Sequence, residues 1–111
     1  MKFAFPCYDK KICAHFGHCQ EFAFIETDEQ NNITKKEYIQ PPEHQPGVYP
    51  KWVTSLGVEI VIGGGMGSMA QSLFTENNVK VVVGAPEEDP EKVLSLYLDD
   101  KLQTTGNACD H

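Results

Sequence analysis

The 111-residue sequence lacks the features of membrane-spanning and nucleic-acid-binding proteins. No apolar run approaches the roughly 18 residues that a bilayer-spanning helix requires. Nine basic residues stand against sixteen acidic ones, a net charge of −7, and the basic residues form no cluster that would bind a phosphate backbone or an anionic membrane surface. We therefore expect neither nucleic acid nor a membrane as a partner.

A secretion signal is also missing from the amino-terminal residues. The opening segment from Met1 to Cys7 is interrupted by Pro6, and no apolar stretch with a small-residue cleavage site follows it. We therefore expect a cytoplasmic protein, in which thiols stay reduced. The four cysteines then indicate metal binding or redox chemistry more often than disulfide bonds.

The length and composition are those of one ordinary folded domain. With 41% hydrophobic and 23% charged residues, the chain has enough apolar side chains to bury a core. One domain usually takes about 100 to 200 residues. We expect residues 1–100 to form a single α/β domain and residues 101–111 to form a carboxyl-terminal tail.

The first half of the sequence predicts three strands. Each is a short run rich in apolar or β-branched residues, and they cover residues 2–6, 21–27 and 33–40. Residues 28–32 favour a hairpin turn, because Asp and Asn tolerate positive φ and bond to the nearby backbone. The polar segment 8–20 is predicted to be a loop, and the proline-rich segment 41–47 a linker.

The second half predicts helices that alternate with strands. The helices are expected at Val48–Leu56, Met66–Phe74 and Pro90–Leu98, and the strands at 58–62 and 79–83. Asp89 is a good cap for the last helix, and Pro90 suits its first position. The alternation of strands and helices implies right-handed crossovers between parallel strands. The hairpin in the first half adds an antiparallel strand to the sheet. The predicted fold is α/β, with a mixed sheet of five strands and about three helices.

Two thiols and two imidazoles lie within the segment 13–19, and Cys7 lies just upstream. These are ligands that zinc, iron and iron-sulfur clusters take in proteins. A loop can aim several such side chains inward, although their spacing matches no standard C-x-x-C zinc motif. The alternative is a surface loop with inert histidines and buried cysteines. The candidate metal ligands are Cys13, His15, His18 and Cys19.

A glycine-rich turn, Gly63-Gly-Gly-Met-Gly67, joins a predicted strand to the helix after it. Glycine amides can approach an anion closely, and a helix N-terminus favours negative charge. The turn also fits part of a dinucleotide-binding fingerprint, but only one more strand follows it, whereas that fold needs two halves. The alternative is a tight turn without a ligand. The candidate binding residues here are Gly63, Gly64, Gly65 and Gly67.

The topology predicts that these two segments meet. If strands 2–6 and 58–62 are parallel neighbours, the loops after them open at the same carboxyl edge, where the strand order reverses. Open α/β sheets bind ligands at such switch points. One crevice would carry thiols and imidazoles on one wall and backbone amides on the other, a combination that suits an anionic metal cluster.

The last six residues add another thiol and imidazole. The ten steps from Lys101 to His111 span up to about 33 Å at roughly 3.3 Å each, more than the roughly 17 Å of a strand. The tail is therefore long enough to close over the site, and Cys109 and His111 are further candidate ligands. A tail whose cysteine and histidine have no role is the alternative.

Three segments carry a resemblance to a known family. They are His15-Phe-Gly17 with Phe22 downstream, the glycine turn 63–67 with Ala70 and Phe74, and Val83-Gly-Ala85. Over roughly residues 1–98 the sequence resembles the dinitrogenase iron-molybdenum cofactor biosynthesis family. The resemblance implies a small ribonuclease H-like α/β domain that binds or carries an iron-sulfur or iron-molybdenum cluster. It implicates His15, Gly17 and the turn 63–67, whereas Cys7, Cys13, Cys109 and His111 rest on their chemistry alone.

Ligand density and resemblance together predict a non-enzymatic protein that binds or carries an iron-sulfur or iron-molybdenum-type cluster. Its partners would be the metallocluster and a protein client in cluster assembly, which the sequence does not identify. Two alternatives stay open. One is a regulatory module that binds phosphate or a nucleotide at the glycine turn, and the other is a small protein with a structural zinc site.

Overall fold

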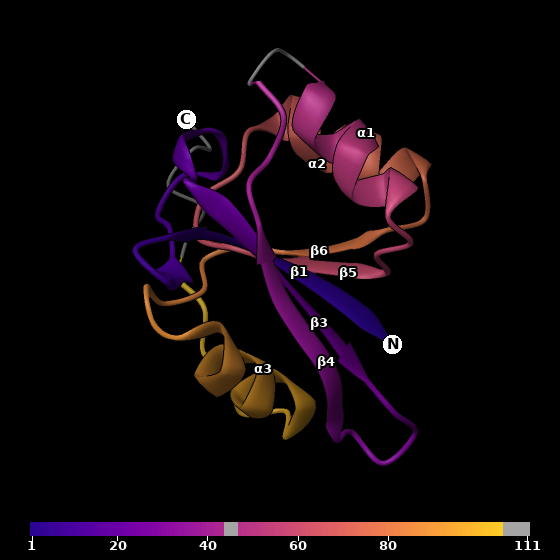
Figure 1. Ribbon diagram of the computed structural model, residues 1–111. Coiled ribbons are helices and arrows are strands. Elements are labelled where there is room, and N and C mark those ends of the chain that lie inside the picture. Colours follow the sequence, from indigo (N-terminus) through magenta and orange to yellow (C-terminus); the bar gives the residue numbers. More distant parts are fainter. Residues whose placement is uncertain (44–46, 106–111) are drawn as a thin grey trace.

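A mixed sheet lies between two layers of helices in the computed structural model, which describes residues 1–43 and 47–105 (Figure 1). The strands are β1 (Lys2–Tyr8), β2 (Lys11–Ile12), β3 (Glu21–Thr27), β4 (Ile33–Ile39), β5 (Ile60–Ile62) and β6 (Lys80–Val82). The helices are α1 (Val48–Ser55), α2 (Ser68–Glu76) and α3 (Pro90–Leu98), with a 3₁₀ turn, η1 (Phe16–His18). Among the described residues, no helix has the length and apolarity needed to cross a bilayer.

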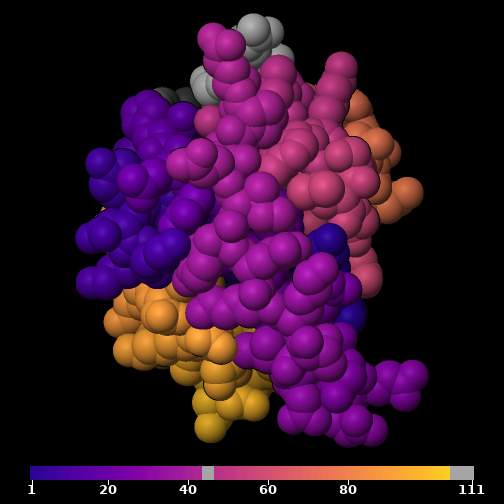
Figure 2. Space-filling view, in the orientation of Figure 1, coloured from indigo at the N-terminus to yellow at the C-terminus, as the bar shows by residue number. Residues whose placement is uncertain are grey.

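The strand order is β4-β3-β1-β5-β6, and β2 pairs with the end of β1. β3 runs antiparallel to β1 and β4, whereas β5 runs parallel to β1 and β6. The loops that follow β1 and β5 therefore leave the sheet at one edge. The turn of the β3–β4 hairpin lies at the opposite end and projects from the body (Figures 1 and 2). The predicted mixed sheet, with its parallel pair at the switch point, is confirmed.

The segment 8–20 is more regular than the predicted loop. Asp9 and Lys10 take positive φ angles of 54° and 64°, and β2 turns back to pair with Cys7 and Tyr8 at the end of β1. Two successive positive φ angles are typical of the tightest hairpin turns, which Asn-Gly usually marks. Asp-Lys is not that signal, so the sixth strand is an addition to the predicted five.

Pro6 does not end β1 as the sequence predicted. The strand continues because pairing with β5 has already ended at Ala4 and Val61. The carbonyl oxygen of Pro6 accepts a bond from Cys13 N at 3.0 Å, so the proline nitrogen also faces this side and interrupts no ladder bond to β3. The other predicted elements are found in place, with bounds shifted by a residue or two.

Side-chain capping predicted from the sequence is confirmed at one turn and at one helix start. In the β3–β4 hairpin, Asp28 Oδ1 accepts bonds from the N–H groups of Gln30 and Asn32, each at 2.9 Å. At the start of α3, Asp89 Oδ1 accepts from Glu91 N at 2.8 Å. Each carboxylate satisfies backbone donors that would otherwise lack a partner at a turn or helix end.

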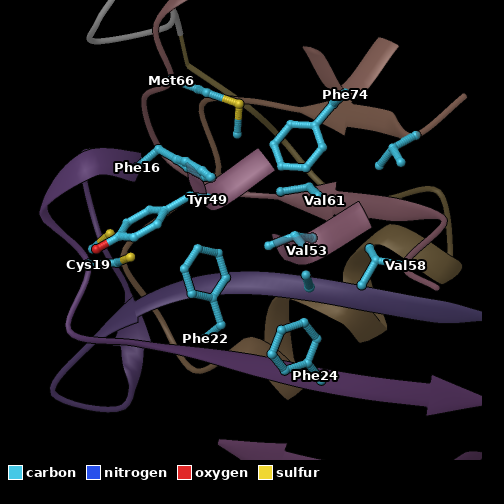
Figure 3. Close-up of a cluster of buried hydrophobic side chains, with 13 residues drawn as sticks. Phe16, Cys19, Phe22, Phe24, Tyr49, Val53, Val58, Val61, Met66 and Phe74 are labelled. Carbon is cyan, nitrogen blue, oxygen red and sulfur yellow. The ribbon is translucent and has the colours of Figure 1, made fainter. Parts of the chain in front are cut away.

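The sheet separates two hydrophobic clusters. One lies between the sheet and α1 with α2, and the other lies against α3. Phe22 is fully buried in the first cluster, and its ring lies 5.3 to 6.1 Å from those of four aromatic neighbours, three of which are labelled in Figure 3. These neighbours are Phe16, Phe24, Tyr49 and Trp52. The aromatic group thus fastens the segment 13–19 to α1 and to the sheet.

We expect Phe22→Ala to lower the free energy of unfolding by about 3 to 5 kcal/mol, because it removes a buried ring and leaves a cavity among aromatic neighbours. Urea unfolding followed by circular dichroism measures the change. Met69→Ala is the control, since this side chain is 57% exposed and should change stability by less than about 0.5 kcal/mol. Equal losses in the two variants would contradict this account of the core.

Candidate functional site

Main-chain hydrogen bonds hold the segment 13–19 against the glycine turn. His15 and Gly65 form an isolated parallel bridge. Gly65 N donates to Ala14 O at 2.6 Å, and Phe16 N donates to Gly65 O at 2.8 Å. The predicted meeting of the two segments at the carboxyl edge of β1 and β5 is therefore confirmed.

Packing explains the first two glycines of the turn. A Cβ atom at Gly64 would lie 2.6 Å from the carbonyl oxygen of Cys13 and 3.0 Å from Cα of Ala14. A Cβ atom at Gly63 would lie 3.0 Å from the ring of Pro6. Only glycine lets these backbones approach so closely.

Two amides of the turn are already used within the protein. Gly63 N donates to Val82 O at 2.9 Å, and Gly65 N donates to Ala14 O at 2.6 Å. The anion-holding role of the turn stays a prediction, and it now concerns only the other amides and the N-terminus of α2. Gly67 lies there, exposed, at the N-cap position.

A pocket of about 350 Å³ opens beside the segment 13–19. Cys13, His15 and His18 line it together with Lys11 and Glu87. Both histidines are exposed, and their ring centroids lie 5.6 Å apart. In Figure 2 the indigo surface of the amino-terminal segment lies directly above the orange surface of the segment that includes α3. Two imidazoles thus lie at the pocket beside one cation and one carboxylate, and the nearly buried Cys13 forms part of its wall.

The thiols of Cys13 and Cys19 face the interior, with these residues only 6% and 9% exposed. Their side chains are hydrogen-bonded to each other. Because Cys19 donates to Cys13, the bond lowers the pKa of Cys13 below that of an ordinary thiol and raises the pKa of Cys19, which burial raises further. Cys13 Sγ also donates to the carbonyl oxygen of His15 at 3.0 Å.

Tyr49 from α1 covers this thiol pair. Figure 3 shows the hydroxyl end of Tyr49 beside Cys19. Burial raises the pKa of Tyr49, and the neighbouring Cys19 raises it further. The tyrosine thus shares the buried cluster that contains both thiols.

Cys7 lies away from the pair, in the cluster on the α3 face. It is fully buried, its Sγ donates to Phe5 O at 3.3 Å, and burial raises its pKa to about 12. Within residues 1–43 and 47–105, no group of three or more His, Cys, Asp or Glu side chains is arranged to hold a metal ion. The structure instead places the predicted histidines on the surface and the predicted thiols behind them.

The predicted tail ligands Cys109 and His111 lie outside the described residues. The last described residue before them, Thr105, lies beside the site, because Thr105 N donates to Gly84 O at 2.8 Å. Gly84 N in turn donates to Gly64 O at 2.5 Å. A second pocket of about 190 Å³ opens there, lined in part by these same residues of the glycine turn and the chain end.

Three features of the site were absent from the sequence prediction. Lys11 is brought to the pocket by the unexpected β2 turn, and Tyr49 is placed beside Cys19 by the packing of α1 (Figure 3). Gly84, in Val83-Gly-Ala85, takes a φ of 79° where Thr105 packs against it. A glycine just after a buried strand was the available signal for this contact.

Comparisons with known proteins agree with this architecture. A family model for the dinitrogenase iron-molybdenum cofactor matches residues 1–100. MJ0580, an uncharacterized protein of Methanocaldococcus jannaschii, is 28% identical over 109 residues, which cover 93% of this chain and 90% of the relative. The crystal structure of PH0822 matches all of both chains at a TM-score of 0.88 and 23% identity. The orange protein of Desulfovibrio gigas matches at 0.74 and 15% identity, over 96% of this chain and 93% of its own. These two structural likenesses show a shared fold.

We expect Gly64→Ser to lower the free energy of unfolding by about 1 to 3 kcal/mol, because the new Cβ atom pushes the backbone of Cys13 away. The matched control is Gly67→Ser, where a Cβ atom meets nothing within 4 Å and the φ of −65° suits serine as a helix cap. Urea unfolding measures stability, and amide exchange at Gly65 and Phe16 reports the bonds across the bridge. Similar behaviour of the two variants would show that the close approach is dispensable.

Proposed function

The chain belongs to the dinitrogenase iron-molybdenum cofactor family, and from this premise we propose that it is a non-enzymatic carrier of an iron-sulfur or iron-molybdenum-type cluster. The domain of residues 1–100 holds the cargo, and a protein client in cluster assembly receives it. One observation carries the proposal. The bridge between His15 and Gly65 places exposed imidazoles and a thiol at one pocket on the switch-point edge of the sheet.

The side chains at the pocket suit a sulfide-rich cluster. The imidazoles of His15 and His18 and the thiol of Cys13 are ligands that iron takes readily. Lys11 favours an anionic cargo, while Glu87 opposes it. Because screening limits the effect of distant charges to about 10 Å in ordinary salt, most of the net charge of −7 does not act on a cargo in the pocket.

The two cysteines have different roles in this proposal. Cys13 lines the pocket and contacts the cargo together with the histidines. Cys19 supports Cys13 from the interior through the hydrogen bond between their side chains. Gly17, exposed between the two histidines, lets a bulky cluster approach the backbone of η1.

We assign the fold to the ribonuclease H-like class and place the protein in the cytoplasm. The class is supported by a sheet with an antiparallel hairpin on one side of β1 and parallel strands on the other. We propose the location because the proposed cargo binding needs a reduced Cys13 thiol, and a reducing compartment keeps thiols in this form.

We expect the full chain, purified without oxygen and incubated with iron and sulfide, to retain iron and to show a broad absorption band near about 400 nm from thiolate–iron and sulfide–iron charge transfer. The double variant His15→Ala with His18→Ala, or the single variant Cys13→Ala, should weaken iron retention about tenfold or more. Losses of this size are typical when residues that support a metal site are removed. Iron, sulfide, molybdenum and zinc analysis after gel filtration measures the bound cargo.

Cys7→Ala is the matched control for this experiment. It also removes one buried thiol, but from the opposite face of the sheet, so the band and the iron content should persist. Unfolding curves of every variant separate a lost ligand from a lost fold. A wild-type chain that binds no metal would contradict the carrier function, and thermal stabilisation by phosphate independent of the cysteines would favour a phosphate-binding module.

We also propose that the tail of residues 101–111 contributes Cys109 and His111 to the same cargo. Thr105 is held at Gly84, beside a pocket that shares Ala14 and Glu87 with the pocket of the two histidines. From Thr105, four further residues span up to about 14 Å, so Cys109 is within reach of the neighbouring pocket.

A chain that stops after Thr105 should retain the cluster about tenfold less well than the full chain, because two ligands are lost. Cys109→Ser with His111→Ala should show the same loss at full length. Asp110→Asn is the control, since it changes the same segment without removing a thiol or an imidazole. Iron retention equal to wild type in the truncated chain would exclude the tail from the site.

A further inference from the structure

The two thiols beside the pocket are held in contact by the fold. Cys13 and Cys19 hydrogen-bond through their side chains and belong to one hydrophobic cluster. Cys13 N donates to Pro6 O at 3.0 Å, and Gln20 N donates to Cys7 O at 2.8 Å. Both ends of the short segment between the thiols are thus tied to β1. Fixed proximity of this kind is what disulfide formation requires.

The two cysteines are both nearly buried, but they differ in their surroundings. Cys13 is one of the residues that line the pocket of about 350 Å³, which is the side from which a small oxidant would approach. Cys19 packs on the interior side, beside Tyr49 (Figure 3). Cys7 lies on the other face of the sheet and does not compete as a partner.

From this arrangement we infer that Cys13 and Cys19 are a reversible redox pair, in which a peroxide oxidises Cys13 first and Cys19 then closes an internal disulfide. The pair is a modification site in its own right. Its consequence for cargo rests on the proposed function: the disulfide removes the Cys13 thiol from the pocket, so the oxidised chain releases its cluster.

The chemistry balances with one hydrogen peroxide for each disulfide. The Cys13 sulfur attacks a peroxide oxygen, the O–O bond breaks, and one oxygen leaves as water, which gives a sulfenic acid. Cys19 Sγ then attacks the Cys13 sulfur. The S–S bond forms, the S–O bond breaks, and the hydroxyl leaves as a second water with the Cys19 proton. Two thiols lose two electrons, and the peroxide gains them.

The sequence makes the disulfide easy to identify. Trypsin cleaves after Lys11 and Lys35, so Cys13 and Cys19 share the peptide 12–35. Cys7 and Cys109 fall in separate peptides, 3–10 and 102–111. An internal disulfide therefore lowers the mass of peptide 12–35 by two hydrogens and joins it to no other peptide.

The test treats the full chain with hydrogen peroxide, alkylates it in denaturant and digests it with trypsin. We expect peptide 12–35 to lose two hydrogens and to take up no alkylating agent, and a thiol reductant should reverse both changes. Peptide 3–10 should remain fully alkylated. Two alkylated cysteines in peptide 12–35, or a link from it to peptide 102–111, would overturn the inference.

Single variants test the order of the two steps. In Cys19→Ala, a dimedone adduct should accumulate on Cys13, because no second thiol resolves the sulfenic acid. In Cys13→Ala, Cys19 should remain unmodified at the same peroxide concentration. Modification of Cys19 instead of Cys13 would reverse the assigned roles, and the wild-type peptide map does not depend on how these variants fold.

A final comparison separates the switch from the carrier function. Reduced and oxidised chains are incubated with iron and sulfide without added thiol, and the oxidised chain should retain about tenfold less iron. Equal retention would overturn the switch and leave the disulfide in place. If the reduced chain also binds no iron, the carrier function fails and the switch fails with it, while the disulfide stands or falls on peptide mapping.

Discussion

The close backbone approach between the glycine turn and the segment 13–19 is the constraint on which the rest of the site depends. Gly64 lies against the backbone of Cys13 and Ala14, where a side chain would collide. That approach lets Gly65 exchange hydrogen bonds with Ala14 and Phe16. Once Phe16 is held there, it packs in the aromatic cluster and the neighbouring histidines face outward. Local backbone packing therefore sets the geometry of the pocket.

The sheet determines which cysteines belong together. Cys7 lies near the end of β1 with its thiol in the cluster against α3, whereas Cys13 and Cys19 lie in the cluster against α1 and α2. Three thiols that are close in sequence are thus divided between two interiors. The pair on one face is in contact, and the single thiol on the other bonds to backbone groups of the sheet.

Much of the fold follows from the sequence because its signals are local. The hairpin turn at 28–32, the Asp89 cap and the alternation of strands with helices each depend on a few neighbouring residues, and each is found as predicted. The parallel pairing of β1 with β5 also follows, since crossover connections are right-handed and sequential elements pack together. The same topology placed the glycine turn beside the segment 13–19.

The details of the site depend on contacts that no local pattern encodes. Residue types predict Cys13, His15, His18 and Cys19 as candidate ligands, but they do not predict that the two cysteines face the core and the two histidines face solvent. The Asp9-Lys10 turn that delivers Lys11 lacks the usual glycine signal. The contact of Thr105 with Gly84 joins residues 21 positions apart through tertiary packing alone.

This division of ligands bears directly on the kind of binding. A resident metal ion in a structural site is enclosed by a full set of ligands from one rigid frame. Here the imidazoles lie on the surface, and Cys13 and Cys19 are nearly buried behind them. If the pocket holds a cluster as proposed, this open and incomplete set of ligands leaves positions at which a client's own ligands can take over the cluster. The arrangement therefore fits the proposed carrier role better than it fits a resident structural site.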